Sequence, residues 1–253
     1  MKTIQIEKQG EHHLIRLNRP KANAINHPMV LDLQDAFWQL QTDPDCKGVL
    51  LTGREQFFSA GLDVMELYDY SPDELSSFWR SFSALIRQMA GFSKPLVCAI
   101  NGHSPAGGCL LAICCDERIM TRDEVYRIGL NEIQVGIVVP QSIFDLYSFW
   151  LGRGMAYSCI MEARLLTPEN ALKAGLVHQI AEHDKVESLA LERLNRLTSY
   201  PQDVWSACKM AGRKGLLEHL NRDFDTDFGP ALQQWWTPSS RAIMQGLIAR
   251  LKK

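Results

Sequence analysis

The chain of 253 residues carries a formal net charge of −2, with 46% hydrophobic and 22% charged residues, an ordinary balance for a globular protein. It holds no basic run that would suggest nucleic-acid binding. No apolar stretch approaches the roughly 20 residues that span a bilayer. We therefore expect neither a nucleic-acid partner nor a membrane.

The start of the chain and its cysteines give an expectation for the compartment. Residues 1–7 already alternate as a strand does, which leaves no room for a targeting peptide. The seven cysteines are an odd number and favour reduced thiols. We expect a cytoplasmic protein, or a mitochondrial matrix protein if a leader was removed. Cys109, Cys114 and Cys115 lack the paired spacing of zinc knuckles, so no metal site is expected.

Strand and helix patterns alternate along the first two thirds of the chain. Apolar and alternating runs predict strands at Ile4–Lys8, His12–Leu17, Gly48–Thr52, Leu96–Ile100, Glu117–Met120 and Val177–Ile180. Ser71, Pro72 and Glu74 form a capping signature for a helix, and Thr167 opens a shorter helix that Gly175 closes. From about residue 184 the pattern is helical. Strands separated by helices indicate an α/β core with right-handed crossovers.

The turn at residues 101–109 has the features of an oxygen-binding site. It follows a predicted strand and precedes a buried helix at residues 110–115, and Gly107 and Gly108 allow close backbone approach. The lysine of a phosphate-binding loop is missing. Residues 102–106 nearly match a nucleophile elbow around Ser104, but the next residue, Pro105, has no N–H to donate. Neither interpretation is favoured.

A third interpretation pairs this turn with an earlier one. Ser59, Ala60 and Gly61 follow another predicted strand and also allow close approach. Two such turns at neighbouring strand ends can converge on one carbonyl oxygen. Taken singly, each turn is better explained as an ordinary tight turn.

Four segments in this order resemble the enoyl-CoA hydratase/isomerase family, also called crotonases, and within it the delta3,delta2-enoyl-CoA isomerases. These segments are Lys21–Asn26, Phe58–Asp63, Asn101–Cys109 and Gly129–Ile137. The resemblance implies a crotonase-like spiral of ββα units in residues 1–182 and a helical oligomerisation region in residues 183–253. It also implies a homotrimer or a dimer of trimers, and an acyl-CoA thioester substrate. No cofactor is expected, because coenzyme A is part of that substrate.

The resemblance also implies the site residues. Glu132 is expected to be the catalytic base, and the backbone N–H groups of Ala60 and Gly107 are expected to stabilise the thioester oxygen as it becomes negative. The residues expected to bind substrate are Ala22, Ala24, Ser59, Gly61, Leu62, Asp63, Val64 and Asn131. For Asp63 and Asn131 the alternative role is to cap a helix and a turn.

One position favours isomerisation over hydration. Two-glutamate hydratases of this family carry an acid where this chain has Leu110, so Glu132 alone remains. The expected reaction moves the double bond of a 3-enoyl-CoA to 2-trans-enoyl-CoA in fatty acid oxidation. One alternative is a hydratase, or another crotonase-family acyl-CoA enzyme, with Asp145 or Glu66 as second acid. The others are a non-catalytic acyl-CoA-binding scaffold and a serine hydrolase.

Two groups of aromatic residues leave alternatives open. The first group consists of candidates for an acyl pocket or for plain core: Phe78, Trp79, Phe82, Tyr147, Phe149 and Trp150. The second group consists of candidates for an interface or for packing within one chain: Trp205, Trp235 and Trp236.

Overall fold

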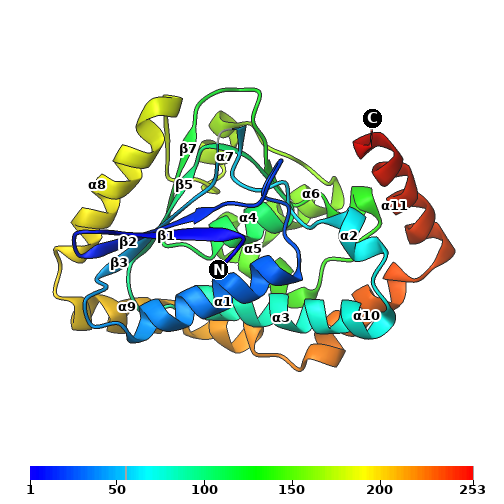
Figure 1. Ribbon diagram of the computed structural model, residues 1–253, viewed down its shortest axis with the longest axis horizontal. Helices are drawn as coiled ribbons and strands as arrows, with labels where there is room; N and C mark the ends of the chain where they lie inside the picture. The colour runs from blue at the N-terminus through cyan, green and yellow to red at the C-terminus, as the bar shows by residue number, and fades with distance from the viewer. Residues whose placement is uncertain (55, 253) are drawn as a thin grey trace.

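The computed structural model describes residues 1–54 and 56–252, and it contains two sheets with helices around them (Figure 1). The larger sheet has the strand order β1-β2-β3-β5-β7-β9. Its strands are β1 (Ile4–Gln9), β2 (His12–Leu17), β3 (Gly48–Thr52), β5 (Leu96–Ile100), β7 (Glu117–Thr121) and β9 (Gln179–Ala181). β1 and β2 are antiparallel, and all other neighbours are parallel.

A smaller parallel sheet, β4-β6-β8, runs beside the first. Its strands are β4 (Gln56–Phe57), β6 (Gly102–Pro105) and β8 (Ile128–Gly129). The first pass places both β1 and β2 in the large sheet before α1. Each of the next three passes places one strand in the large sheet, the next strand in the small sheet, and then a helical segment. This repetition is the spiral of ββα units that the sequence predicts. The small strands were missed, and the predicted direct turn at residues 101–106 is in fact strand β6.

Helices follow each pass of the spiral. The helices of this part are α1 (His27–Thr42), α2 (Val64–Tyr68), α3 (Pro72–Ala90), α4 (Gly107–Ile113), the 3-10 helix η1 (Glu132–Val135), α5 (Gln141–Leu151), α6 (Arg153–Met161) and α7 (Pro168–Lys173). The Ser71 capping box at the start of α3 is confirmed. Helix α4 begins at Gly107, after Ala106, whose φ of 49° turns the chain sharply from β6 into the helix.

Beyond Ala181 the described chain is entirely helical. Its helices are η2 (His183–Lys185), α8 (Val186–Thr198), α9 (Gln202–Leu220), α10 (Phe224–Trp235) and α11 (Pro238–Leu251). Strand β9 begins two residues later than predicted, because Val177 packs in the core just before the strand pairs with β7.

Alternation along the strands divides the core between the two faces of the large sheet. Leu14, Leu50 and Val97 face α8, where they pack against Val186 and Leu194. The intervening strand residues face the main core, which lies between the sheets and α1, α3 and α4. Because α8 closes one face of the sheet, the helical segment shares a core with the spiral (Figure 1).

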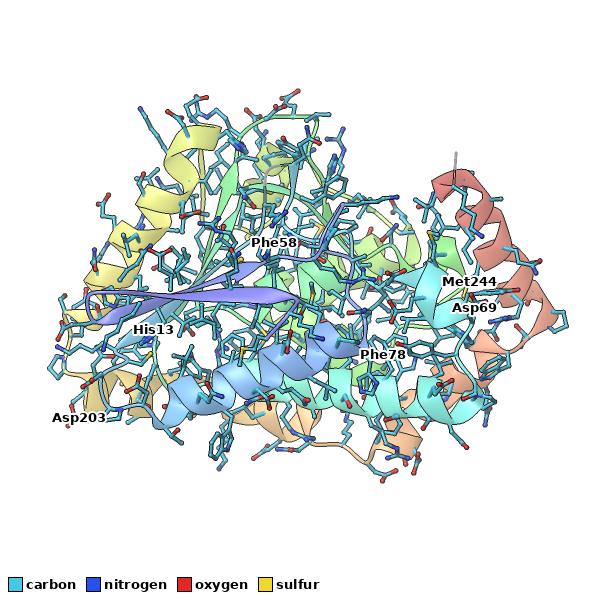
Figure 2. The ribbon with its side chains drawn as sticks, viewed as in Figure 1. His13, Phe58, Asp69, Phe78, Asp203 and Met244 are labelled. Carbon is cyan, nitrogen blue, oxygen red and sulfur yellow. The ribbon has the colours of Figure 1, made fainter. Side chains whose placement is uncertain are left out.

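Several of the aromatic candidates lie in that core, whereas Phe149 and Trp236 are exposed. Phe78, Trp79 and Phe82 of α3 form a cluster with Phe228 of α10, and Trp235 is fully buried. Figure 2 shows Phe78 inside the layer between α1 and α3. For these residues, packing within one chain is the observed role.

Candidate active site

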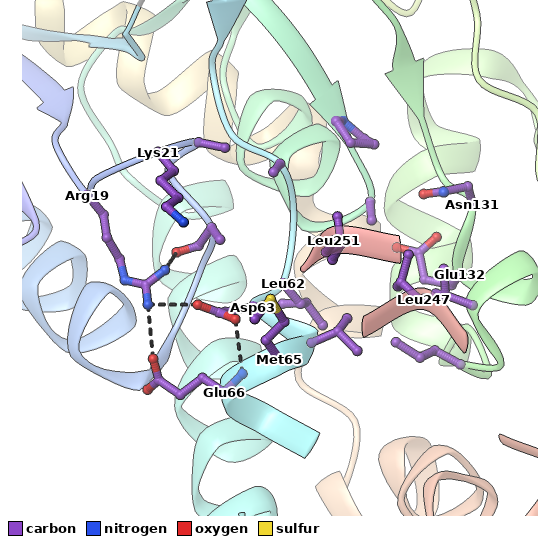
Figure 3. A pocket seen from close by; sticks show the side chains of 18 of the residues that line it. Arg19, Lys21, Leu62, Asp63, Met65, Glu66, Asn131, Glu132, Leu247 and Leu251 are labelled. Carbon is purple, nitrogen blue, oxygen red and sulfur yellow. Dashed lines mark hydrogen bonds and ion pairs between the residues drawn. The ribbon is translucent and has the colours of Figure 1, made fainter. Parts of the chain in front are cut away.

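The residues that the sequence singles out meet around a cavity of about 850 Å³. The cavity lies between the loop before α1, the turn before α2, η1 and the end of α11 (Figure 3). Its lining includes Arg19, Lys21, Ala22, Ala24, Ala60, Leu62, Asp63, Val64, Glu66, Pro105, Ala106, Asn131, Glu132, Val135, Ile137, Leu247, Leu251 and Lys252. One end of this cavity is polar and the other is apolar.

Glu132 is the first residue of η1 and points into the cavity (Figure 3). Only 7% of its surface is exposed, and its Oε2 atom has no hydrogen-bond partner in the part of the chain that the structure describes. Loss of hydration disfavours the charged form, so burial raises the pKa of Glu132 from 4.5 to about 7. A carboxyl group with this pKa takes up and releases a proton readily near neutral pH.

Two turns bring two backbone N–H groups close together: Leu62 lines the cavity, and Gly107 follows Ala106, which also lines it. The N–H of Gly107, at the start of α4, and the N–H of Leu62 both lack an acceptor among the described residues. A Cβ atom added to Gly107 would lie 3.4 Å from the nitrogen of Leu62. Since such free donors stabilise a developing negative charge, this pair can hold a thioester oxygen.

The N–H of Ala60 has a different role. It donates to the carbonyl oxygen of Ala22 at 2.9 Å. This hydrogen bond contradicts the prediction that Ala60 supplies a free donor. Leu62, which the sequence assigned only to substrate binding, presents the free N–H instead.

Ser59 and Gly61 shape the first turn without lining the cavity. The Ser59 hydroxyl donates to the carbonyl oxygen of Asn23 at 2.8 Å and accepts from the N–H of Gly61 at 3.1 Å. Gly61 has a φ of +85°, and a Cβ atom there would lie 3.0 Å from the carbonyl oxygen of Pro105. Only glycine fits this close approach between the two turns.

Asp63 fulfils its alternative role as a cap. Its carboxylate accepts from the N–H of Glu66 at 3.0 Å and so begins α2. It also lies 2.7 Å from Nη2 of Arg19. Asn131 lines the cavity next to Glu132, and its side chain makes no capping hydrogen bond with η1. Asn131 therefore has a side chain free to meet a ligand.

An arginine that the sequence analysis missed organises the polar end of the cavity. Arg19 pairs with Asp63, lies 3.0 Å from Oε2 of Glu66, and donates to the carbonyl oxygen of Ala24 at 2.9 Å (Figure 3). It thereby fixes the loop that carries Ala22 and Ala24 to the turn that carries the Leu62 N–H. No local motif marks Arg19, because its partners come from a distant segment.

Two lysines bring positive charge to the cavity, and leucines form its other end. In the ranges 1–54 and 56–252, neither Lys21 nor Lys252 forms an ion pair. Leu247 and Leu251 come from α11 and lie on the same side as Glu132 in Figure 3. No sequence motif marks these two leucines, since they reach the site only because the chain folds back.

The residues that a serine hydrolase or a two-acid hydratase would use either lie outside the cavity or already have hydrogen-bond partners. Ser104 is fully buried in β6, and it does not line the cavity. Asp145 lies on α5, where it pairs with Arg222 at 3.2 Å. Glu66 lines the cavity, but its oxygens accept hydrogen bonds from Asn26, Arg19 and Tyr70. Glu132 is thus the carboxylate best placed to accept a proton.

Comparisons with known proteins agree on one family. The sequence profile described as enoyl-CoA hydratase/isomerase matches residues 7–246. The enoyl-CoA delta isomerase 1, mitochondrial, of Rattus norvegicus is 33% identical over 89% of this chain and 79% of its own length. A short-chain-enoyl-CoA hydratase of Clostridium acetobutylicum is 29% identical over 85% of this chain and 83% of its own length.

A solved structure supports the same relationship. The crystal structure of human mitochondrial delta3-delta2-enoyl-CoA isomerase is similar with a TM-score of 0.95 and 30% identity, covering 99% of this chain and 98% of that one. The match extends over the spiral and the C-terminal helices alike. Within the described ranges, no helix combines the length and apolar character needed to cross a membrane.

Proposed function

Because the chain belongs to the enoyl-CoA hydratase/isomerase family, we propose that it is a delta3,delta2-enoyl-CoA isomerase. The reaction moves the double bond of a 3-enoyl-CoA to 2-trans-enoyl-CoA, a step that belongs in fatty acid oxidation. The observation that carries the proposal is the buried carboxylate of Glu132, with a pKa of about 7, together with the free N–H groups of Leu62 and Gly107.

The chemistry follows from these three groups. The N–H groups of Leu62 and Gly107 hold the thioester oxygen, and each such donor is typically worth about 3 kcal/mol in the transition state. Glu132 removes a proton from C2, and the electron pair of that C–H bond passes into a dienolate whose charge rests on the oxygen. Glu132 then returns a proton to C4, which leaves the double bond between C2 and C3. One base is sufficient for this sequence.

The polar end of the cavity suits the nucleotide part of coenzyme A. Lys21 supplies positive charge for phosphate groups at this end, and it forms no ion pair in the described chain. The loop held by Arg19 offers the backbone of Ala22 and Ala24 to the adenine. This arrangement directs the acyl group to the opposite, apolar end.

Hydration is the second candidate, because a hydratase is among the relatives. Adding water to a 2-enoyl-CoA requires a second polar group that holds and polarises the water. Leu110 is buried and apolar, Asp145 is paired away from the cavity, and Glu66 is occupied by three partners. The free carboxylate of Glu132 also argues against a scaffold that only binds acyl-CoA, because a raised pKa without a function would cost stability.

Product analysis separates these candidates. The enzyme is incubated with 3-trans-hexenoyl-CoA and, in a separate reaction, with 2-trans-hexenoyl-CoA, and the thioesters are resolved by chromatography and mass. We expect conjugated 2-enoyl-CoA from the first substrate and no appreciable 3-hydroxyacyl-CoA from the second. Formation of 3-hydroxyhexanoyl-CoA at a comparable rate would make the protein a hydratase. Recovery of both substrates unchanged, with binding intact, would favour the scaffold.

A further inference from the structure

The second half of α11 has an apolar edge that the described chain leaves uncovered. Leu247 and Leu251 line the main cavity, yet Leu247 is only half-buried and Leu251 is 59% exposed. They lie four residues apart, so they share one face of the helix and are separated by about 6 Å along its axis. After Met244 no described residue of α11 is buried. This part of the helix contributes to the lining of the cavity through Leu247 and Leu251.

The first half of α11 is fixed to both walls of the site. The Ser240 hydroxyl donates to the carbonyl oxygen of Gly136 at 2.8 Å, at the end of the 3-10 helix that carries Glu132. On the other wall, Arg241 donates to the carbonyl oxygen of Tyr68 at 2.9 Å, and its guanidinium stacks 3.3 Å from the centre of the Tyr68 ring.

These anchors hold the helix in a defined position over the cavity. Figure 2 shows Met244 of α11 beside Asp69, the residue that ends α2, and the two helices are in contact. Helix α2 follows directly after the Leu62 turn, and η1 begins with Glu132. The apolar edge of α11 is therefore fixed relative to both the oxygen-binding N–H groups and the base.

We infer that α11 is the wall that selects acyl chain length, and that Leu247 and Leu251 favour medium-chain over short-chain acyl-CoA. The inference rests on the proposed function for the direction of the substrate. With the nucleotide toward Lys21 and the thioester at the two N–H groups, the acyl chain passes Glu132 toward Ile137 and the leucines. The first carbons end near Glu132, and only a longer chain reaches α11.

The expected difference in affinity between long and short acyl-CoA follows from the burial of methylene groups. Each methylene that leaves water against an apolar wall improves binding by about fourfold. A butyryl chain gains nothing from α11, whereas a chain that covers the turn between the two leucines buries several methylenes. The preference should therefore rise steeply over the middle of a length series and then level off.

Binding of saturated acyl-CoA tests this without any reaction, because such compounds have no double bond to move. Dissociation constants are measured by calorimetry for butyryl-, hexanoyl-, octanoyl- and decanoyl-CoA with wild type, Leu247→Gln and Leu251→Gln. In wild type we expect at least about tenfold tighter binding of decanoyl- than of butyryl-CoA. Each glutamine variant should lose a large part of this gain and bind butyryl-CoA as wild type does.

The matched control places the same side chain elsewhere on the same helix. Ala249 is exposed, and it does not line the cavity, so Ala249→Gln should keep the wild-type length dependence. A dissociation constant that does not change with length in wild type overturns the inference. The inference is also overturned if the glutamine variants weaken the binding of butyryl-CoA and of decanoyl-CoA by the same factor.

An isomerisation assay on the same proteins keeps the two proposals distinguishable. Selective binding of long chains without turnover of any 3-enoyl-CoA would leave the length selection standing and reject the isomerase. Turnover with the same efficiency at every chain length would leave the isomerase standing and reject the role of α11.

Discussion

The backbone N–H of Ala60 donates to the carbonyl oxygen of Ala22 at 2.9 Å, whereas the N–H of Leu62 has no acceptor in the described chain. Leu62 forms a bridge with Ile25, so the backbone groups of its neighbours face Ile25 while its own N–H faces away. The register of this short pairing thus decides which N–H remains available beside Gly107.

Replacing single backbone N–H groups by ester oxygens separates the two residues. An α-hydroxy acid at Leu62 removes the free donor and keeps the side chain, so we expect kcat to fall by about 10² to 10³. The same change at Ala60 removes a structural hydrogen bond, so we expect about 1 kcal/mol less stability and nearly unchanged kcat. Steady-state kinetics and urea unfolding of both esters measure this. The opposite pattern would return the oxygen-binding role to Ala60.

Glu132 should make the folded protein less stable as the pH rises. Its pKa is raised to about 7 in the folded state, so the unfolded chain releases this proton first, and stability falls between pH 4.5 and about 7. Glu132→Gln lacks this loss and should be more stable than wild type at pH 8 by up to about 3 kcal/mol. Urea unfolding at pH 5 and pH 8 measures the difference.

The control for this pH effect is Glu218→Gln, which changes an exposed glutamate on α9. Its stability relative to wild type should not depend on pH in this window. If the free energy of unfolding of Glu132→Gln relative to wild type also does not increase between pH 5 and pH 8, the Glu132 carboxyl group is not buried in solution as it is in the structure.

Loss of the Arg19 side chain should weaken substrate binding more than turnover. Arg19→Met removes the link between the carbonyl oxygen of Ala24, Asp63 and Glu66. A hydrogen bond to a charged group contributes about 1.5 to 3 kcal/mol, so we expect KM to rise about tenfold or more with a small change in kcat. Arg122→Met, which removes an exposed arginine paired with Glu182, is the control. An equal loss of kcat would mean that Arg19 acts on the chemical step.

A buried charge cluster should control global stability. Asp116 lies 2.7 Å from Nζ of Lys209 and 3.0 Å from Arg213, and both cations are almost fully buried. Asp116→Asn leaves these charges uncompensated and should cost about 3 to 5 kcal/mol in urea unfolding. Asp225→Asn, which breaks an exposed pair with Arg80, should cost less than about 1 kcal/mol. Similar costs for both variants would contradict this account.

The sequence predicts those parts of the fold that leave a local pattern. Strands β2, β3 and β5 have the predicted bounds because their residues are nearly all buried and, in β3 and β5, mostly apolar. Strands β4 and β8 have two residues each, and β6 combines glycine, polar residues and proline. Such short strands form because the larger sheet brings them side by side, and no pattern within them predicts this.

The site residues also divide into those that a local sequence pattern predicts and those that depend on distant segments. Glu132 and Gly107 stand in motifs and could be identified from the sequence, whereas the choice between Ala60 and Leu62 depends on the pairing with a distant segment. Arg19 acts through partners some 45 residues away along the chain. These partners are Asp63, which caps α2, and Glu66 within α2. Residues of α11 reach the cavity only after the whole chain has folded back over η1.

The most direct test of the central claim is the turnover of a 3-enoyl-CoA by Glu132→Gln, with Glu66→Gln as the other carboxyl variant of the same cavity. The account predicts that kcat falls by about 10² to 10⁴ in Glu132→Gln, as expected for loss of a general base, and stays within a few-fold of wild type in Glu66→Gln. Wild-type kcat in Glu132→Gln, or an equal loss in Glu66→Gln, would contradict catalysis by a single glutamate base.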